Sequence, residues 1–91
     1  MARRHIITIY SKPDCHLCER AKEVLHRVQS SVPFSLEEVD ISQNPELFAL
    51  YGHDIPVILL DGTEIARHFV RERNLLKLLQ SPNQPAEERR T

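Results

Sequence analysis

The fold is decided by residues 5–30, which read HIITIYSKPDCHLCERAKEVLHRVQS. The segment His5 to Tyr10 carries isoleucine on both faces, which predicts a strand buried on both sides. The residues Ser11-Lys12-Pro13-Asp14 then break the strand, and from Cys15 to about Ser30 the period becomes helical. The apolar stripe of this helix consists of Leu17, Ala21, Val24, Leu25 and Val28. The stretch therefore predicts a strand that leads into a Cys-x-x-Cys at the start of a helix.

The remaining sequence extends this unit to the order β-α-β-α-β-β-α. Asn44-Pro45 is typical of a helix start and Gly52 of a helix stop, so a short helix is expected between them, ending near Tyr51. Asp61-Gly62 is typical of a hairpin turn. The other expected elements are strands at Phe34–Ile41, Val57–Leu60 and about Glu64–Arg67, and a last helix at about Val70–Gln80.

These elements predict one α/β domain over residues 5–80, with a single mixed four-stranded sheet and helices on both faces. The strand–helix–strand opening implies a parallel pair with a right-handed crossover, and the hairpin implies an antiparallel pair. Ligands of such sheets bind beyond the carboxyl ends of the parallel strands, where Cys15 is expected. Residues 81–91 hold two prolines, four charges and a single alanine, so a disordered tail is expected there.

The composition argues against several classes of function. A net charge of −1 and only five aromatic residues do not suit a nucleic-acid surface. No apolar run approaches the roughly 18 residues of a membrane helix, and the apolar run after the basic start is too short for a signal peptide. We therefore expect a cytoplasmic protein that binds neither nucleic acid nor membrane, and we expect it to be a monomer.

The two cysteines of the chain, Cys15 and Cys18, form one Cys-x-x-Cys. A secreted disulfide scaffold has more cysteines spread along the chain, and a bond across three residues closes almost no loop. At the start of a helix, free backbone N–H groups favour a thiolate, which predicts Cys15 as the attacking and leaving thiol. Cys18, one turn deeper, is the expected resolving thiol. Lys12 and His16 add positive charge, which Asp14 opposes.

Other interpretations of the cysteine pair remain open. Two cysteines are half of a zinc site, but a closed site needs four ligands and the sequence contains no His-x3–5-His pair. The pair can also consist of inert buried thiols. A further alternative is a binding module that shares a soft metal ion or an iron–sulfur cluster between two chains, because thiolates suit such ions. That module needs additional ligands from a partner chain or from glutathione.

Four segments of the chain carry a resemblance to a known family. They are residues 7–18 (ITIYSKPDCHLC), 39–41 (VDI), 55–57 (IPV) and 61–62 (DG). With these segments the chain resembles a glutaredoxin, the short version of the thioredoxin fold, over about residues 5–80. It looks closest to small glutaredoxin-like proteins whose active-site motif differs from the usual Cys-Pro-Tyr-Cys.

The resemblance implies a thiol–disulfide oxidoreductase with Cys15 as the nucleophile and Cys18 as the resolving thiol. It also implies a cis Pro56 that faces the cysteine pair. The backbone of Ile55 would pair with an extended substrate segment. Lys12 would match the basic residue that assists the thiolate or binds a carboxylate of glutathione.

The sequence departs from the glutaredoxin pattern at the positions that hold glutathione. Glutaredoxins have a Gly-Gly pair and an acidic residue after the fourth strand, whereas residues 65–72 read IARHFVRE. Asp54 stands where the family commonly has threonine. The expected reductant is therefore either glutathione or a thioredoxin-reductase-like enzyme. Protein or small-molecule disulfides are the expected substrates, and no tightly bound cofactor is expected.

Overall fold

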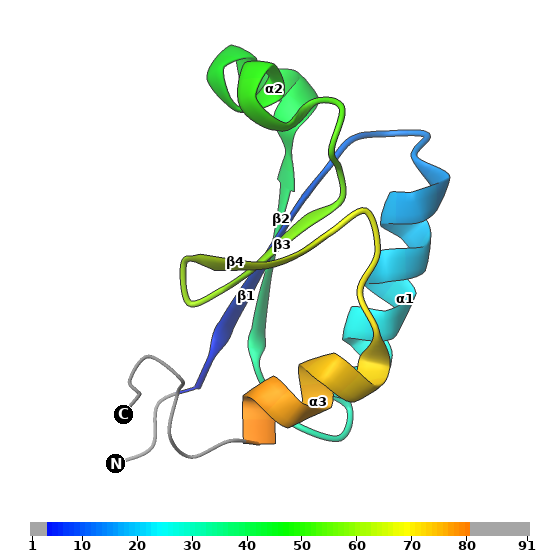
Figure 1. The fold of residues 1–91 in the computed structure, drawn as a ribbon, viewed down its shortest axis with the longest axis vertical. Coiled ribbons are helices and arrows are strands. Elements are labelled where there is room, and N and C mark those ends of the chain that lie inside the picture. Colours follow the sequence, from blue (N-terminus) through cyan, green and yellow to red (C-terminus); the bar gives the residue numbers. More distant parts are fainter. Residues whose placement is uncertain (1–3, 81–91) are drawn as a thin grey trace.

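The computed structural model describes residues 4–80 of the 91-residue chain (Figure 1). The predicted tail at 81–91 lies outside the described residues. The elements are β1 (Ile6–Ser11), α1 (His16–Gln29), β2 (Ser35–Asp40), a 3-10 turn η1 (Ile41–Gln43), α2 (Pro45–Tyr51), β3 (Val57–Leu60), β4 (Thr63–Arg67) and α3 (Glu72–Gln80). Apart from η1, this is the expected order.

The four strands form one mixed sheet in the order β2-β1-β3-β4. β1 is parallel to β2 and antiparallel to β3, and β3 is antiparallel to β4. The α/β class and the mixed four-stranded sheet are therefore confirmed. The central strand β1 is fully buried on one face only: Ile7 and Ile9 are buried, whereas Ile6 on the other face is 42% exposed, so the prediction of a strand buried on both sides is wrong there.

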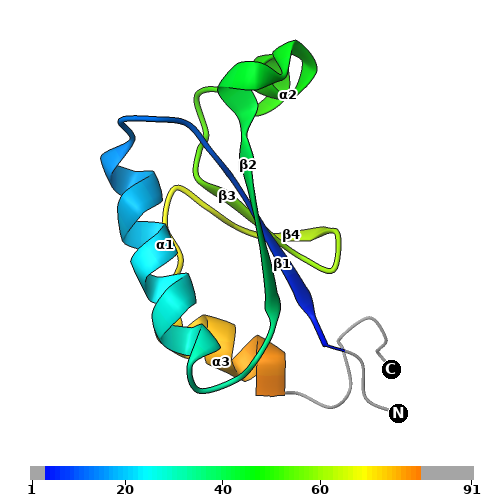
Figure 2. The same cartoon turned by 180° about the vertical axis from the view of Figure 1, so that it is seen from behind.

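The main core lies between one face of the sheet and the helices α1 and α3. Ile7 and Ile9 of β1 and Ile58 of β3 point into it and are fully buried. Figures 1 and 2 show α1 and α3 on this side of the sheet and α2 beyond the carboxyl end of β2. Helix α2 contacts the opposite face only at that end, where the ring centroids of Tyr51 and Tyr10 lie 5.2 Å apart.

The turns that position these elements follow local sequence signals. The Asn44 side chain caps α2 by accepting a hydrogen bond from the Leu47 N–H at 3.1 Å. Asp61 and Gly62 both have positive φ, 51° and 90°, as a two-residue hairpin turn of the I′ type requires. The Asp61 carboxylate also accepts a hydrogen bond from the N–H of Ile6, so the hairpin is tied to the start of β1.

Several boundaries differ from the sequence prediction by one or two residues, and two of them have a local cause. The second strand ends at Asp40, because its carboxylate accepts a hydrogen bond from the Ser42 N–H at 2.9 Å and starts η1. Ile41 is therefore part of η1 rather than of the strand, and it is fully buried. The last helix begins at Glu72 rather than Val70, because His68 has a φ of 71° and the chain turns there.

Between residues 4 and 80, no helix combines the length and the apolar character that a membrane crossing requires.

Candidate functional site

The cysteine pair lies at the junction of β1 and α1, at the carboxyl end of the central strand. Cys15 and Cys18 form a disulfide, with Cα atoms 5.2 Å apart, a usual separation for such a bond. Cys15 is the N-cap of α1, and its sulfur accepts a hydrogen bond from the Cys18 N–H at 3.2 Å. A sulfur in this position faces the free N–H groups and the positive end of the helix dipole, which stabilise a thiolate.

The loop before the pair turns the chain sharply into the helix. Pro13 and Asp14 form the turn, and Asp14 has a φ of 62°, in the left-handed region. Aspartate tolerates this conformation better than most residues because its short polar side chain bonds locally. The sequence signal for this turn was correct, whereas the backbone conformation could be seen only in the structure.

The two sulfurs have unequal access to solvent. Cys18 is fully buried, in an apolar cluster with Ile41 and Ile55. Cys15 is only partly buried and lines a pocket of about 270 Å³ with Asp14, His16 and Glu19. An external disulfide would therefore meet the sulfur of Cys15 first.

The segment before β3 packs against the cysteine pair. The Ile55–Pro56 peptide bond is cis, as the glutaredoxin resemblance implies. Ile55 is 7% exposed and belongs to the cluster of Cys18, and Pro56 is fully buried. The pairing of the Ile55 backbone with a substrate, and the substrate-facing role of Pro56, stay predictions.

Lys12 is not part of the pocket at Cys15. It is exposed and lines a second depression with Pro13, Glu38 and Asp40, on the β2 side of the loop; this depression adjoins the pocket at Cys15, since Glu19 lines both. A role of Lys12 in holding a thiolate or a carboxylate therefore stays a prediction.

A polar cluster beside the cis-proline segment was missed by the sequence analysis. Arg67 lies at its centre: its Nη1 is 3.0 Å from Asp54 Oδ2, and its Nη2 is 3.1 Å from Glu64 Oε1. The guanidinium also lies 5.7 Å from the centroid of the Tyr51 ring, and His68 Nε2 is 3.4 Å from Asp54 Oδ1. No local signal marks this cluster, because the register shift between Ile58 and Leu59 that sets the position of Arg67 cannot be deduced from the Asp61-Gly62 turn.

This cluster shifts the protonation of Glu64. The hydrogen bond from Arg67 lowers the pKa of the Glu64 carboxyl below its ordinary value of 4.5, and the same hydrogen bond raises the pKa of Arg67. A carboxyl whose pKa is lower in the folded state stabilises the fold above its unfolded pKa. That contribution is lost as the pH falls below 4.5 and through the folded pKa.

We expect Arg67→Gln to raise the pKa of Glu64. The free energy of unfolding should then fall less steeply as the pH decreases below 4.5. An NMR titration of the Glu64 carboxyl, with unfolding measured from pH 7 to pH 3, checks both effects. Arg27→Gln is the matched control, because it removes the ion pair with Glu72 and leaves Glu64 untouched. An unchanged Glu64 titration in Arg67→Gln would show that the contact does not form in solution.

Metal ligation by the pair would require ligands from elsewhere. Among residues 4–80, no three side chains of His, Cys, Asp or Glu are grouped to hold a metal ion. The cysteines can supply two thiolates, half of a closed tetrahedral site.

The chain is similar in sequence to glutaredoxin-like proteins. Residues 6–80 match the model of the glutaredoxin-like domain (DUF836). A "Glutaredoxin-like protein YDR286C homolog" of Dictyostelium discoideum is 33% identical over 75 residues, covering 76% of this chain and 69% of the relative.

Solved structures agree with this match. Protein Ne2328 of Nitrosomonas europaea superposes with a TM-score of 0.76 at 26% identity, covering 88% of this chain and 96% of the other. The thioredoxin of Fasciola hepatica superposes with a TM-score of 0.56 at 25% identity, covering 84% and 78%. The fold is therefore thioredoxin-like.

Proposed function

The chain belongs to the family of the glutaredoxin-like domain (DUF836), and from this we propose that it is a thiol–disulfide oxidoreductase with Cys15 and Cys18 as its redox-active dithiol. One observation carries the proposal. The accessible sulfur of Cys15 caps a helix and is bonded to a sulfur that is fully buried one turn further on. A purely structural disulfide does not require one accessible and one buried sulfur. A two-step exchange does, because one sulfur must meet the substrate and the other must attack afterwards.

The proposed reaction transfers two electrons from the dithiol to a substrate disulfide. The Cys15 thiolate attacks one substrate sulfur, the substrate S–S bond breaks, and the first substrate thiolate leaves. Cys18 gives up its proton and attacks the sulfur of Cys15, which expels the second substrate thiolate. The Cys15–Cys18 bond that remains must be reopened by an external dithiol or by two thiols.

The proposed partners follow from this cycle. The substrates are protein or small-molecule disulfides, and the reductant is glutathione or a thioredoxin-reductase-like enzyme. Residues 65–72, the segment where glutaredoxins have a Gly-Gly pair, contain no glycine, and His68 in this segment adopts a φ of 71°. Because every step uses groups of one chain and ends in a disulfide that cellular thiols reopen, we propose a monomer that works in the cytoplasm.

A redox titration of the two thiols tests the proposal. The purified protein is equilibrated in defined thiol–disulfide buffers, alkylated, and analysed by mass. We expect one reversible two-electron step between about −120 and −270 mV, the range of redox-active dithiols. Absence of a step, or thiols that become reactive only after a chelator is added, would contradict the proposal and favour a soft-metal or iron–sulfur carrier.

A further inference from the structure

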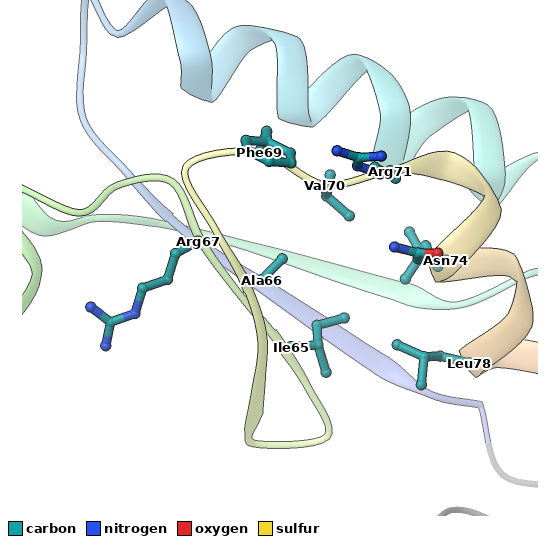
Figure 3. A pocket seen from close by; sticks show the side chains of 9 residues that line it. Ile65, Ala66, Arg67, Phe69, Val70, Arg71, Asn74 and Leu78 are labelled. Atoms are coloured by element: carbon teal, nitrogen blue, oxygen red, sulfur yellow. The ribbon is translucent and has the colours of Figure 1, made fainter.

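A pocket of about 230 Å³ lies between β4, the segment that follows it, and α3 (Figure 3). It is separate from the pocket at Cys15. Its lining includes Ile65, Phe69, Val70, Arg71, Leu75 and Leu78.

The floor of this pocket is apolar and continuous with the main core. Leu75 is fully buried, and Ile65, Val70 and Leu78 are partly buried and pack against that core. Phe69 lies at the rim and remains 55% exposed. The hollow and the exposed ring beside it can together surround an apolar side chain of another molecule.

The rim of the pocket is positively charged. The Arg71 guanidinium carbon lies 5.4 Å from the centroid of the Phe69 ring, and Arg71 has no carboxylate partner among residues 4–80. The nearest acidic residues along the chain are already paired, Glu64 with Arg67 and Glu72 with Arg27. The charge that complements this rim is therefore negative.

The segment at the rim of the pocket contacts the cis-proline segment of the proposed active site. The His68 N–H donates a hydrogen bond of 2.7 Å to the carbonyl of Pro56, so the segment leading to Phe69 lies directly against the cis-proline segment. Ile55, in that segment, packs in the cluster of Cys18. Because Phe69 follows His68 directly, the rim of the pocket is joined to the segment that packs against the cysteine pair.

The volume of the pocket limits the size of the group that can fill it. Pockets that enclose small-molecule ligands span roughly 300–1,000 Å³, which is more than this hollow offers. A space of this size suits a side chain or two of a larger molecule that is held mainly elsewhere.

We propose that this pocket docks a segment of a polypeptide substrate, in which an apolar side chain is flanked by carboxylates near the disulfide cysteine. The inference rests on the proposed oxidoreductase function and extends it, because it makes acidic polypeptide disulfides the preferred substrates. The apolar side chain fills the hollow beside Phe69, and a neighbouring carboxylate pairs with Arg71.

Three probes test the proposal on the reduced full-length protein, with oxidation of the dithiol followed by mass. Two are disulfide-linked peptide dimers with one cysteine and nearby leucines, identical except for aspartates in one and lysines in the other. The third is the small neutral hydroxyethyl disulfide. We expect the acidic peptide to react about three- to tenfold faster than the basic one, as for an exposed ion pair formed in one case and opposed in the other.

Two charge-reversed variants locate the effect. Arg71→Glu should remove or invert the peptide preference while the rate with hydroxyethyl disulfide stays unchanged. Arg73→Glu is the matched control, since it makes the same charge change two residues away without lining the pocket, and it should keep the preference. Phe69→Ala should slow both peptides and spare the small disulfide.

The outcomes separate the two proposals. Equal rates for the two peptides, or equal effects of Arg71→Glu and Arg73→Glu, would overturn the docking site while leaving the oxidoreductase function in place. Absence of reaction with all three disulfides would overturn the oxidoreductase function, and the docking site with it.

Discussion

Replacing Cys15 with serine is expected to reduce disulfide turnover to the uncatalysed background. Cys15 is the partly exposed sulfur of the pair, and Cys18 is fully buried, so no second nucleophile can take over the first step. The loss should not arise from unfolding, because serine is a favourable N-cap residue for α1. The measurement is reductase activity with hydroxyethyl disulfide, alongside the far-UV circular dichroism of the variant.

Cys18→Ser is the matched variant for the second step of the reaction. Cys15 still attacks, but the mixed disulfide has no resolving thiol and should accumulate as one adduct per chain, visible by mass. Substantial turnover by Cys15→Ser would contradict the mechanism. Failure of Cys18→Ser to accumulate an adduct under the same conditions would contradict the assignment of the resolving thiol.

Phe34→Ala is expected to lower the free energy of unfolding by about 3–5 kcal/mol, the usual cost of truncating a buried aromatic side chain. Phe34 is 1% exposed and belongs to the main core, directly before β2. Its carbonyl also accepts a hydrogen bond of 2.8 Å from Gln29 at the end of α1, so the residue joins that helix to the sheet. Domains of this size have only about 5–15 kcal/mol of stability in total, so much of it should be lost.

The same substitution at an exposed phenylalanine provides the control. Phe48 on α2 is 43% exposed, and Phe48→Ala should cost less than about 1 kcal/mol. Urea unfolding of both variants, analysed with the slope of the parent protein, gives the comparison. Similar losses for the two variants would show that Phe34 does not have the central place in the core that its burial indicates.

The parts of the fold that could be predicted are those determined by local sequence. The periodicity of residues 15–30 placed α1 to within a residue, and Asn44-Pro45 and Asp61-Gly62 placed a cap and a turn that the structure confirms. The position of Cys15 at the helix start followed from the same local pattern. Periodicity, capping and turn chemistry act over a few residues, so they can be seen in one sequence.

The parts that could not be predicted depend on contacts between distant segments. A register shift between Ile58 and Leu59 places Arg67 opposite Val57, whereas an unbroken hairpin would place Ala66 there. The cluster of Arg67 with Asp54 and Tyr51 depends on that shift. The burial of Ile41 in η1, under the cysteine pair, likewise depends on packing that no local pattern specifies.

The uneven covering of the sheet has an evolutionary consequence. Helices α1 and α3 cover one face of the sheet. On the other face, Ile6 of β1 and Glu37 of β2 remain exposed, because α2 contacts only the end of that face. Selection for apolar side chains should therefore act on the buried positions of β1 and not on the exposed positions between them. Among homologues, Ile7 and Ile9 should remain aliphatic, while Ile6 and Thr8 drift freely in size and charge, so the strand should diverge with a period of two.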